Sequence, residues 1–310
     1  MELCNSYIEE HCELLCKKST INLYKGYVNV NLVLLHNKKA KNITKRDIDL
    51  LVVSWKQSGM KNKSINNLTG FVYSVFKHGI SNKWIKENPM CDVKKLPKEK
   101  RDVRFFDEDE IQEYLKIIAT FPFKKYIALL TLLETGMRIS EFTAIEWSDI
   151  NFKKLTISIN KQYYKGKLTT PKTYTSTRII DISPSLADLL LRLKRESTVL
   201  SKIIFCGRTG GYMNQEKFIK NWFKKATAAV GKPEYNIHSL RHTHATFLLQ
   251  NGVPINYVSE RLGHSSPQTT LNVYSHVMPK ITNQAMNLFE KIKKEHFKSI
   301  EISERVEAQQ

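Results

Sequence analysis

The spacing of apolar residues constrains the fold of this chain more than any other feature. Over residues 1–95 and again over 106–147, apolar residues recur every three or four positions, which is typical of amphipathic helices. The pattern changes over residues 155–182, where apolar and polar residues alternate and Gly166 and Pro171 interrupt them. This alternation predicts two or three short antiparallel strands. We therefore expect a mainly α protein with one small antiparallel β-sheet.

Chain length and helix-start signals together predict two domains. At 310 residues the chain is longer than one hydrophobic core usually serves. Residues 1–95 have the pattern of a bundle of short helices and are expected to form the first domain. The basic, proline-containing segment 96–105 is expected to be a linker. Asp107 and Glu110 then form a capping-box pattern, which opens a second domain over residues 106–279.

The chain is strongly basic. It has 49 Lys and Arg against 30 Asp and Glu, a formal net charge of +19. A surface of this kind attracts polyanions, so nucleic acid is the first candidate partner. Charge alone leaves a second explanation open, namely a lysine-rich composition that does not reflect the binding of any ligand.

The cysteines and the hydropathy pattern argue against several other classes of protein. The five cysteines are scattered, odd in number and without C-x-x-C spacing, so the sequence supports neither a disulfide framework nor a zinc site. The N-terminus lacks the pattern of a signal peptide, and no apolar stretch is long enough to span a membrane. We expect a protein of the reducing cytoplasm with no membrane partner.

Polar residues suited to phosphate chemistry fall in five segments of the second domain, each at a predicted helix end or turn. The segments are ETGMRISE with Arg138, TPKTYTSTR with Lys172, HSLRHTH with His238 and Arg241, ERLGHSS with His264, and TLNVYSH with Tyr274. His238 and Arg241 are three apart, and we expect them on the first turn of a helix capped by Ser239. Gly263 is expected to end the helix before His264, and Pro267 to open the helix of Tyr274.

Each of these residues taken singly has an ordinary structural explanation. Arg138 can be an ion-pair partner of Glu141, Lys172 a solvated turn residue and Tyr274 a half-buried aromatic. The histidines lack the carboxylate or cysteine that would complete a metal site. The order of the five segments along the chain nevertheless favours a shared function, because a purely structural role would rarely require all of these residues together.

In this order the residues resemble the tyrosine recombinase, or phage integrase, family, whose catalytic domain carries an R…K…H-x-x-R…H/W…Y set. The segments LRHTHAT, VSERLGHSS and TLNVYSH match its C-terminal motifs nearly word for word. The match is strong over residues 105–280 and looser over residues 5–95. It implies a helical core-binding domain followed by an α+β catalytic domain. Ser239 stands at a variable position where many relatives carry Asp.

The resemblance implies that Arg138 and Arg241 bind the scissile phosphate. The transition state carries extra negative charge on the nonbridging oxygens, and a planar guanidinium can face two oxygens at once. His264 would add a neutral donor to the same oxygens. Glu141 would orient Arg138 without touching the phosphate itself.

The resemblance also assigns the nucleophile and the proton transfers. Tyr274 would attack phosphorus and form a 3′-phosphotyrosyl link. Its phenol is protonated at neutral pH, so it needs a proton acceptor, and His238 is the expected one. Lys172, in a strand turn, would give a proton to the leaving 5′ oxygen. One phosphodiester replaces another, so we expect no cofactor; no Walker or dinucleotide motif occurs and no acidic cluster suggests a two-metal nuclease.

Double-stranded DNA is the partner that the resemblance implies, bound by a homo-tetramer on two DNA sites. Accessory DNA-bending or directionality proteins are compatible further partners. Residues 280–310 carry an apolar stripe at helical spacing and are expected to form a tail helix that docks on a neighbouring protomer. The same stripe would also allow the tail to fold back on its own domain.

The expected function is site-specific recombination that integrates or excises a mobile element. Three alternatives stay open: a recombinase of the chromosome-dimer-resolving type, a topoisomerase with the same tyrosine chemistry, and a non-catalytic DNA-binding regulator of the same fold. The filled catalytic positions favour an active enzyme, and the helical first domain with its tail favours recombination over relaxation.

Overall fold

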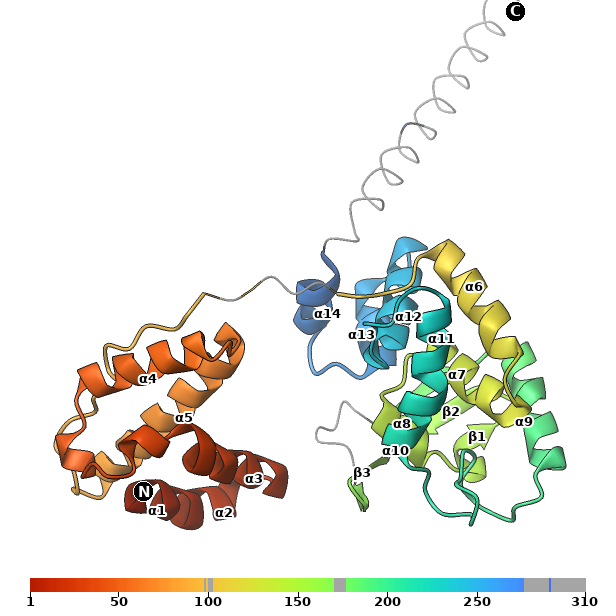
Figure 1. The fold of residues 1–310 in the computed structure, drawn as a ribbon. Coiled ribbons are helices and arrows are strands. Elements are labelled where there is room, and N and C mark those ends of the chain that lie inside the picture. Colours follow the sequence, from red (N-terminus) through yellow and green to blue (C-terminus); the bar gives the residue numbers. More distant parts are fainter. Residues whose placement is uncertain (98, 100–102, 170–176, 276–289, 291–310) are drawn as a thin grey trace, which may run out of the picture. The chain divides into compact units, whose positions relative to one another are not determined.

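Helices make up most of the computed structural model, which describes residues 1–97, 99, 103–169, 177–275 and 290 (Figure 1). The chain divides into two units, Met1–Arg101 and Asp102–Gln310. The strands lie in the second unit and form small antiparallel sheets, so the mainly α class predicted from the sequence is confirmed. Among the helices of the described residues, none is long and apolar enough to cross a membrane.

The first unit is a bundle of helical segments. They are α1 (Glu2–Ser6), η1 (Tyr7–Cys12), α2 (Glu13–Leu15), α3 (Lys18–Gly26), η2 (Tyr27–Asn31), η3 (Val33–Leu35), η4 (Ala40–Asn42), α4 (Lys45–Gln57) and α5 (Asn62–Ser81). Thr44 caps α4 through a reciprocal pair of hydrogen bonds with Asp47. The long helix α5 buries Ile65, Leu68 and Phe71 in the core of this unit.

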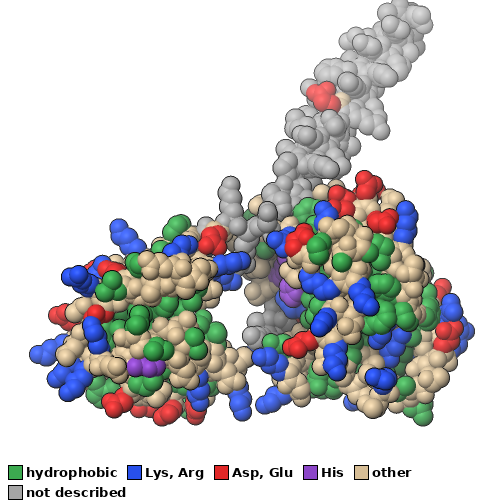
Figure 2. Space-filling model, in the orientation of Figure 1, with side chains coloured by type: hydrophobic (Ala, Val, Ile, Leu, Met, Phe, Trp, Pro, Cys, Tyr) green, Lys and Arg blue, Asp and Glu red, His purple; other side chains and the backbone are tan. Residues whose placement is uncertain are grey.

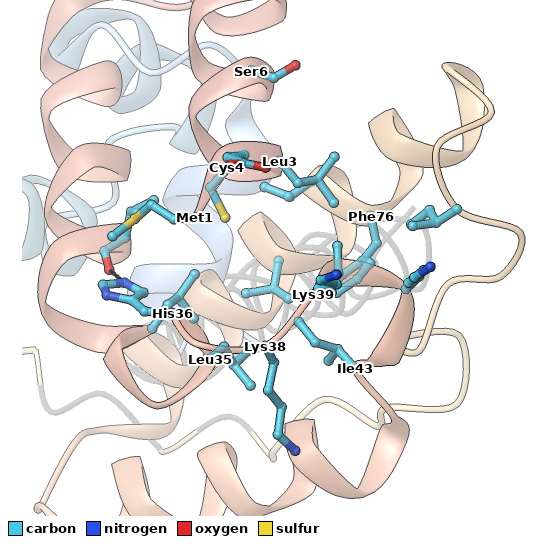
Figure 3. Close-up of a pocket in the computed structure, with 18 of the residues that line it drawn as sticks. Met1, Leu3, Cys4, Ser6, Leu35, His36, Lys38, Lys39, Ile43 and Phe76 are labelled. Carbon is cyan, nitrogen blue, oxygen red and sulfur yellow. Dashed lines mark hydrogen bonds between the residues drawn. The ribbon is translucent and has the colours of Figure 1, made fainter.

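A pocket of about 680 Å³ lies in the first unit, lined by α1, by the segment from η2 to the loop after η4, and by α5 (Figure 3). Its lining is largely apolar and includes Val28, Leu32 and Phe76. Lys38 and Lys39 contribute charge from the loop between η3 and η4. Lys38 is already paired with Asp47, so part of that charge is neutralised.

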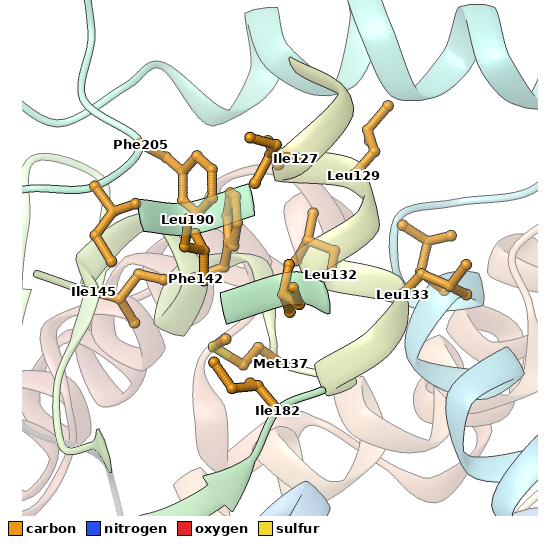
Figure 4. Close-up of a cluster of buried hydrophobic side chains, with 14 of the residues drawn as sticks. Ile127, Leu129, Leu132, Leu133, Met137, Phe142, Ile145, Ile182, Leu190 and Phe205 are labelled. Atoms are coloured by element: carbon orange, nitrogen blue, oxygen red, sulfur yellow. The ribbon is translucent and has the colours of Figure 1, made fainter. Parts of the chain in front are cut away.

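The main core of the second unit is built around α7 (Phe123–Thr135). Its buried side chains include Ile127, Leu129 and Leu132, which belong to one apolar cluster with Phe142 and Phe205 (Figure 4). The other helical segments are α6 (Glu108–Ala119), α8 (Ile139–Ala144), η5 (Trp147–Asp149), α9 (Pro184–Glu196), α10 (Gln215–Phe218), η7 (Ile219–Phe223), α11 (Lys224–Ala229), α12 (His238–Gln250), α13 (Ile255–Leu262) and α14 (Pro267–Tyr274). The predicted capping box of Asp107 and Glu110 opens α6 and is confirmed.

The alternating stretch of the sequence forms antiparallel strands, as predicted. Within the described residues they number four rather than the expected two or three, and they belong to two sheets rather than one. One sheet has the order β1-β2-β5, made of β1 (Ile150–Asn151), β2 (Thr156–Ile159) and β5 (Arg178–Asp181), all antiparallel. A separate hairpin joins β3 (Gln162–Tyr164) to β4 (Lys167–Thr169). Ile157 of β2 pairs with Ile180 of β5, and both are buried, whereas the neighbouring Ile179 is exposed. The sheet therefore packs one face on the core.

A smaller apolar cluster joins the last helices of the described chain. It contains Ala245 and Leu249 from α12, Val258 and Leu262 from α13, and Tyr274 from α14. The expected nucleophile is therefore a core residue of its own domain, packed where α12, α13 and α14 meet.

Candidate active site

Arg138 stands at the N-cap of α8, one residue ahead of the helix, as the sequence predicted. Gly136 ends α7 with a φ of +62°, and a Cβ there would lie 2.7 Å from the ring of His244, so this turn requires glycine. The Arg138 guanidinium donates to Glu141 Oε1 at 2.8 Å and to the carbonyl of Gly263 at 3.2 Å. The short turn therefore aims Arg138 across the domain toward the end of α13.

Glu141 is buried and lies between two arginines. It accepts hydrogen bonds from Arg138 and, at 2.9 Å, from Nη2 of Arg178, with 3% and 7% of the Glu141 and Arg178 side chains exposed. Burial opposes its charge, but the hydrogen bond and charge of Arg178, together with Arg138, lower the pKa of Glu141 to about 2. The carboxylate is thus ionised and fixes both guanidinium groups.

Arg178 is a residue that the sequence reading did not single out. It is the last residue of the segment TPKTYTSTR, so the sequence predicts its place on a strand. Nothing in the sequence indicates which carboxylate it pairs with. Its Nε donates to the carbonyl of Arg261 at 2.7 Å. Arg178 therefore ties strand β5 both to α8 and to the end of α13.

Arg241 comes from α12 and is buried, with 4% of its surface exposed. Its two terminal nitrogens donate to the carbonyls of Gly136, at 2.9 Å, and Leu262, at 2.7 Å. Burial, and then the charge of Arg138, lower the pKa of Arg241 to about 9, so it remains a cation at neutral pH. The guanidinium is held by backbone acceptors rather than by a carboxylate of its own.

Three arginines thus donate to three successive carbonyls at the C-terminal end of α13. Arg178 meets the carbonyl of residue 261, Arg241 that of residue 262 and Arg138 that of residue 263. The last carbonyls of a helix lack intrahelical partners and carry the negative end of its dipole, so they attract cations. This helix end concentrates positive charge in one place, as binding of an anion would require.

His264 follows directly on that helix end. Gly263 takes a φ of +66° and caps α13, as predicted, and His264 Nδ1 lies 2.7 Å from the Thr270 hydroxyl. Burial, and then the charges of Arg241 and Arg138, lower the pKa of His264 to about 3, so the ring is neutral at physiological pH. A Thr270 hydroxyl that donates to Nδ1 places the ring proton on Nε2, as a neutral donor.

The predicted cap of α12 is wrong. The helix begins at His238, and Ser239 is buried inside it, with its hydroxyl among the unpaired buried groups of the described residues. The side chain of Asn236 instead accepts from the backbone N–H of His238 at 2.9 Å. An Asx turn that begins at Asn236, two residues before the first residue of the helix, therefore stands in place of the expected serine cap. His238 and Arg241 still share the first turn, and burial followed by Arg241 lowers the pKa of His238.

Tyr274 ends α14, whose first residue is Pro267, as expected. Only 1% of its surface is exposed, and burial raises the pKa of its phenol to about 12 despite the opposing charge of Arg241. Its hydroxyl lies 2.7 Å from Nδ1 of His242. The expected proton acceptor His238 stacks edge-on against His242 at 6.5 Å between ring centroids, one ring further from the phenol.

Lys172 lies outside the described residues, as does the expected tail helix apart from Glu290. The hairpin that precedes Lys172 is described, and its strand β3 is anchored to neighbouring residues through Tyr163. Gln215 Nε2 donates to the carbonyl of Tyr163 at 2.7 Å, and the ring of Tyr163 stacks on Tyr212 with centroids 3.9 Å apart. Within the described part of the chain, no group of three or more His, Cys, Asp and Glu is arranged to hold a metal ion.

Comparison with known proteins defines the class. Residues 104–280 match the phage integrase family, and this match covers more than half of the chain. The chain therefore belongs to the phage integrase family and is a tyrosine-type site-specific recombinase. The family, the fold class and the kind of enzyme that the motifs predicted are confirmed.

Two curated relatives cover most of the chain. The XerC-like tyrosine recombinase of Caldanaerobacter subterraneus subsp. tengcongensis is 27% identical over 320 residues, covering 92% of this chain and 81% of that protein. The ICEBs1 integrase of Bacillus subtilis is 29% identical over 251 residues, covering 76% of this chain and 68% of that protein.

Solved structures share the fold. The Tn1549 transposon integrase in complex with circular intermediate DNA has a TM-score of 0.78 at 19% identity, covering 92% of this chain and 98% of that one. A lambda integrase dimer bound to a COC′ core site has a TM-score of 0.69 at 17% identity, covering 90% and 95%.

Proposed function

We propose that this chain integrates or excises a mobile element by cutting and rejoining double-stranded DNA through a 3′-phosphotyrosyl link to Tyr274. The observation that carries the proposal is the convergence of Arg138 and Arg241 on the C-terminal end of α13, next to His264. The similarity to an ICEBs1 integrase and a transposon integrase supports the mobile-element setting.

The arginines would stabilise the pentavalent phosphorus of the transition state. Arg138 and Arg241 are held in place before DNA arrives, by Glu141 and by backbone carbonyls, so little reorganisation accompanies the reaction. Preorganised donors of this kind contribute about 10²–10³ in rate each, by analogy with oxyanion holes. His264, as a neutral donor, would contact the same oxygens.

The proton transfers need a base and an acid. Tyr274 would give its proton to His238 as its oxygen bonds to phosphorus, and the bond to the 5′ oxygen breaks. Lys172 would give a proton to that leaving oxygen, which becomes a free 5′-hydroxyl. Attack by a 5′-hydroxyl of another DNA end reverses the sequence and releases Tyr274. Glu141, ionised between two arginines, would keep Arg138 oriented through both steps.

The two units divide the task in this proposal. Residues 1–95 would be the core-type DNA-binding domain, residues 96–105 the linker, residues 106–279 the catalytic domain, and residues 280–310 a tail helix that docks on a neighbouring protomer. Lysine and arginine side chains are spread over the visible faces of both units (Figure 2). This distribution and the net charge of +19 support binding to a DNA backbone through both units.

The active assembly would be a homo-tetramer on two DNA sites. A lambda integrase tetramer bound to a Holliday junction shares the fold, with a TM-score of 0.66 at 17% identity, which supports an assembly of this kind. Accessory DNA-bending or directionality proteins would act on this assembly in the cell.

A suicide-substrate experiment tests the proposal. The protein is incubated in EDTA with nicked duplexes that carry the ends of its element, and denaturing gels reveal any covalent protein–DNA adduct. We expect an adduct that survives EDTA and is absent from Tyr274→Phe. DNA binding without an adduct on any site would favour the non-catalytic regulator instead.

A recombinase of the chromosome-dimer-resolving type is the second candidate, favoured by the similarity to XerC proteins. The two candidates differ in their DNA sites. A mobile-element integrase should join an element end to a separate target, whereas a resolving enzyme should act on two copies of one chromosomal site. Plasmids carrying either pair of sites distinguish them by the size of the recombinant product.

A further inference from the structure

His244 is a buried, titratable side chain that the proposed mechanism does not use. It lies on α12, three residues after Arg241, and 8% of its surface is exposed. Burial, and then the charges of Arg261 and Arg241, lower the pKa of His244 to about 3. The ring is therefore neutral at physiological pH, with one nitrogen that donates a hydrogen bond and one that accepts.

The partners of His244 determine which ring nitrogen carries the proton. Nε of Arg261 lies 2.9 Å from Nε2 of His244. A guanidinium nitrogen can only donate, so Nε2 is the acceptor and the ring proton is on Nδ1. A hydrogen bond with the backbone of Leu133 opposes the fall in the pKa, which is the effect of a bond that the ring donates to a carbonyl. His244 thus joins the C-terminal part of α7 to α13.

The His244 ring also lies against the turn that follows α7. A Cβ at Gly136 would come within 2.7 Å of Cδ2 of the ring, so the ring packs directly on the Gly136 backbone. The carbonyl of Gly136 accepts a hydrogen bond from Arg241 at 2.9 Å, and Arg138 is two residues further along the chain. The ring therefore supports a turn on which both arginines of the proposed phosphate site depend.

Arg261 ties the other side of His244 to neighbouring segments. Its Nη2 donates to the carbonyl of Asp181 at the end of β5, at 2.9 Å, and to that of Glu134 in α7, at 3.4 Å. Arg261 is also in the last turn of α13, two residues before Gly263. The position of Arg261 therefore helps to fix the helix end on which the arginines converge.

The arginines of the proposed phosphate site span the same two segments. Arg241 donates to carbonyls of the turn after α7 and of the end of α13, and Arg138 reaches from the turn to the end of α13. His244 and Arg261 join these two segments through a separate hydrogen bond. A change in the spacing of the segments would therefore displace both guanidinium groups together.

We propose that His244 is a positioning residue for strand cleavage, which sets this spacing through its contact with Gly136 and the hydrogen bond that it accepts from Arg261. The inference rests on the proposed role of Arg138 and Arg241, and it adds a residue that acts through them. Both ring nitrogens of His244 are engaged by protein groups, so the ring binds no phosphate oxygen. Its loss should slow cleavage far more than it weakens DNA binding.

Two substitutions separate this role from packing alone. His244→Phe keeps an aromatic ring against Gly136 but removes the acceptor for Arg261. In His244→Gln the side-chain oxygen is the same number of bonds from the backbone as Nε2, so it can keep the hydrogen bond from Arg261. Ile118→Ala is the control for lost stability, because Ile118 is buried in the main core and takes no part in these hydrogen bonds.

The rate of first adduct formation is measured on the nicked substrate at saturating protein, at a temperature where circular dichroism shows every variant folded. The dissociation constant for the same DNA is measured alongside. A displacement of about 1 Å can cost about 10²-fold in rate, so we expect His244→Phe to form the adduct about 10- to 100-fold more slowly. His244→Gln and Ile118→Ala should react at nearly the unaltered rate.

Four outcomes of this experiment would overturn the proposal. They are an unaltered rate in His244→Phe, a rate in His244→Gln as low as that in His244→Phe, an equal loss of rate in Ile118→Ala, and a loss of DNA affinity in His244→Phe as large as its loss of rate.

A kinetic double-mutant cycle tests whether His244 acts through Arg261. In the Arg261→Met background the donor is already gone, so adding His244→Phe should slow adduct formation much less than His244→Phe does alone. Losses of rate that multiply in the double variant would show that the two residues act independently, which contradicts the proposal.

A spectroscopic measurement tests the same bond even if His244→Phe fails to fold. In ¹⁵N-histidine-labelled protein the His244 ring, identified by its absence from His244→Gln, should carry its proton on Nδ1. A proton on Nε2 would overturn the proposal. This measurement needs no DNA, so absence of any adduct from the unaltered chain would count against the proposed function alone, and the two failures are distinct.

Discussion

The guanidinium of Arg178 and the carboxylate of Glu141 face each other through two hydrogen bonds, at 2.9 Å and 3.3 Å, and both groups are buried. The Arg138 guanidinium also donates to Oε1 of this carboxylate, at 2.8 Å. One carboxylate therefore holds two arginines that arrive from different parts of the chain, a strand and a helix N-terminus. About a third of the Arg138 side chain is exposed, and this pairing explains how its guanidinium nevertheless keeps a fixed orientation.

Loss of Arg178 should destabilise the second unit. Arg178→Ala leaves Glu141 with one cationic partner and frees a carbonyl at the end of α13, so we expect a loss of about 2–3 kcal/mol in the free energy of unfolding. Urea denaturation measures it. The control is Lys45→Ala, which removes the exposed pair with Asp49 and should leave stability nearly unchanged. An equal loss of unfolding free energy in the two variants would show that the buried pair stabilises the protein no more than an exposed pair does.

Acid should weaken the protein partly through Glu141. Its pKa in the folded protein is lowered from the usual 4.5 to about 2, so the stability it contributes is present above pH 4.5 and is lost as pH falls toward 2. Because Gln does not titrate, Glu141→Gln should remove that part of the pH dependence. Urea unfolding from pH 6 down to 3 should bring the stabilities of the two proteins closer together. A difference that stays constant over this range would contradict the ionised carboxylate.

The turn at Gly263 should tolerate no side chain. Its φ of +66° strains an L-residue, and a Cβ would lie 2.8 Å from Nη1 of Arg178. Gly252, at a φ of +79° with open space around it, is the matched control. Gly252→Ala should cost about 1 kcal/mol from backbone strain alone, and Gly263→Ala about 1–3 kcal/mol more as Arg178 is displaced. Similar melting temperatures for the two variants would contradict this contact.

Arg241→Lys should impair cleavage more than binding. Lysine keeps the charge but cannot donate to the carbonyls of Gly136 and Leu262 with one planar group, so its charge would not be held at the phosphate site. We expect adduct formation to slow by about 10²-fold or more, with DNA affinity reduced less than 10-fold. Single-turnover kinetics give the rate of adduct formation, and binding isotherms on the same substrate give the DNA affinity. A loss of rate no larger than the loss of affinity would mean that Arg241 serves binding alone.

The sequence predicted the parts of the fold that local signals determine. The capping box at Asp107, the glycine turn at Gly263, and the change to alternating strands each rest on a few adjacent residues. The cap of α12 was misassigned because Asn236 and Ser239 are both good capping residues a few positions apart. Local pattern alone does not say which of them the tertiary packing leaves at the helix start.

The contacts between distant segments were not predictable from the same signals. Arg178 meets Glu141 across 37 residues, and His242 meets Tyr274 across 32. Motif spacing says that these residues occur, but only the tertiary fold brings each pair together. No single-sequence pattern distinguishes a histidine that contacts a hydroxyl, as His242 does, from one that only fills space.

The most direct test of the central claim is to identify the residue that carries the DNA. The adduct from the nicked substrate is digested with nuclease and trypsin, and the modified peptide is sequenced by mass spectrometry. We predict that the nucleotide is attached to the peptide that contains Tyr274. Attachment to a peptide containing Tyr163, Tyr164 or Tyr174 instead would contradict the assignment of the nucleophile and the mechanism built on it.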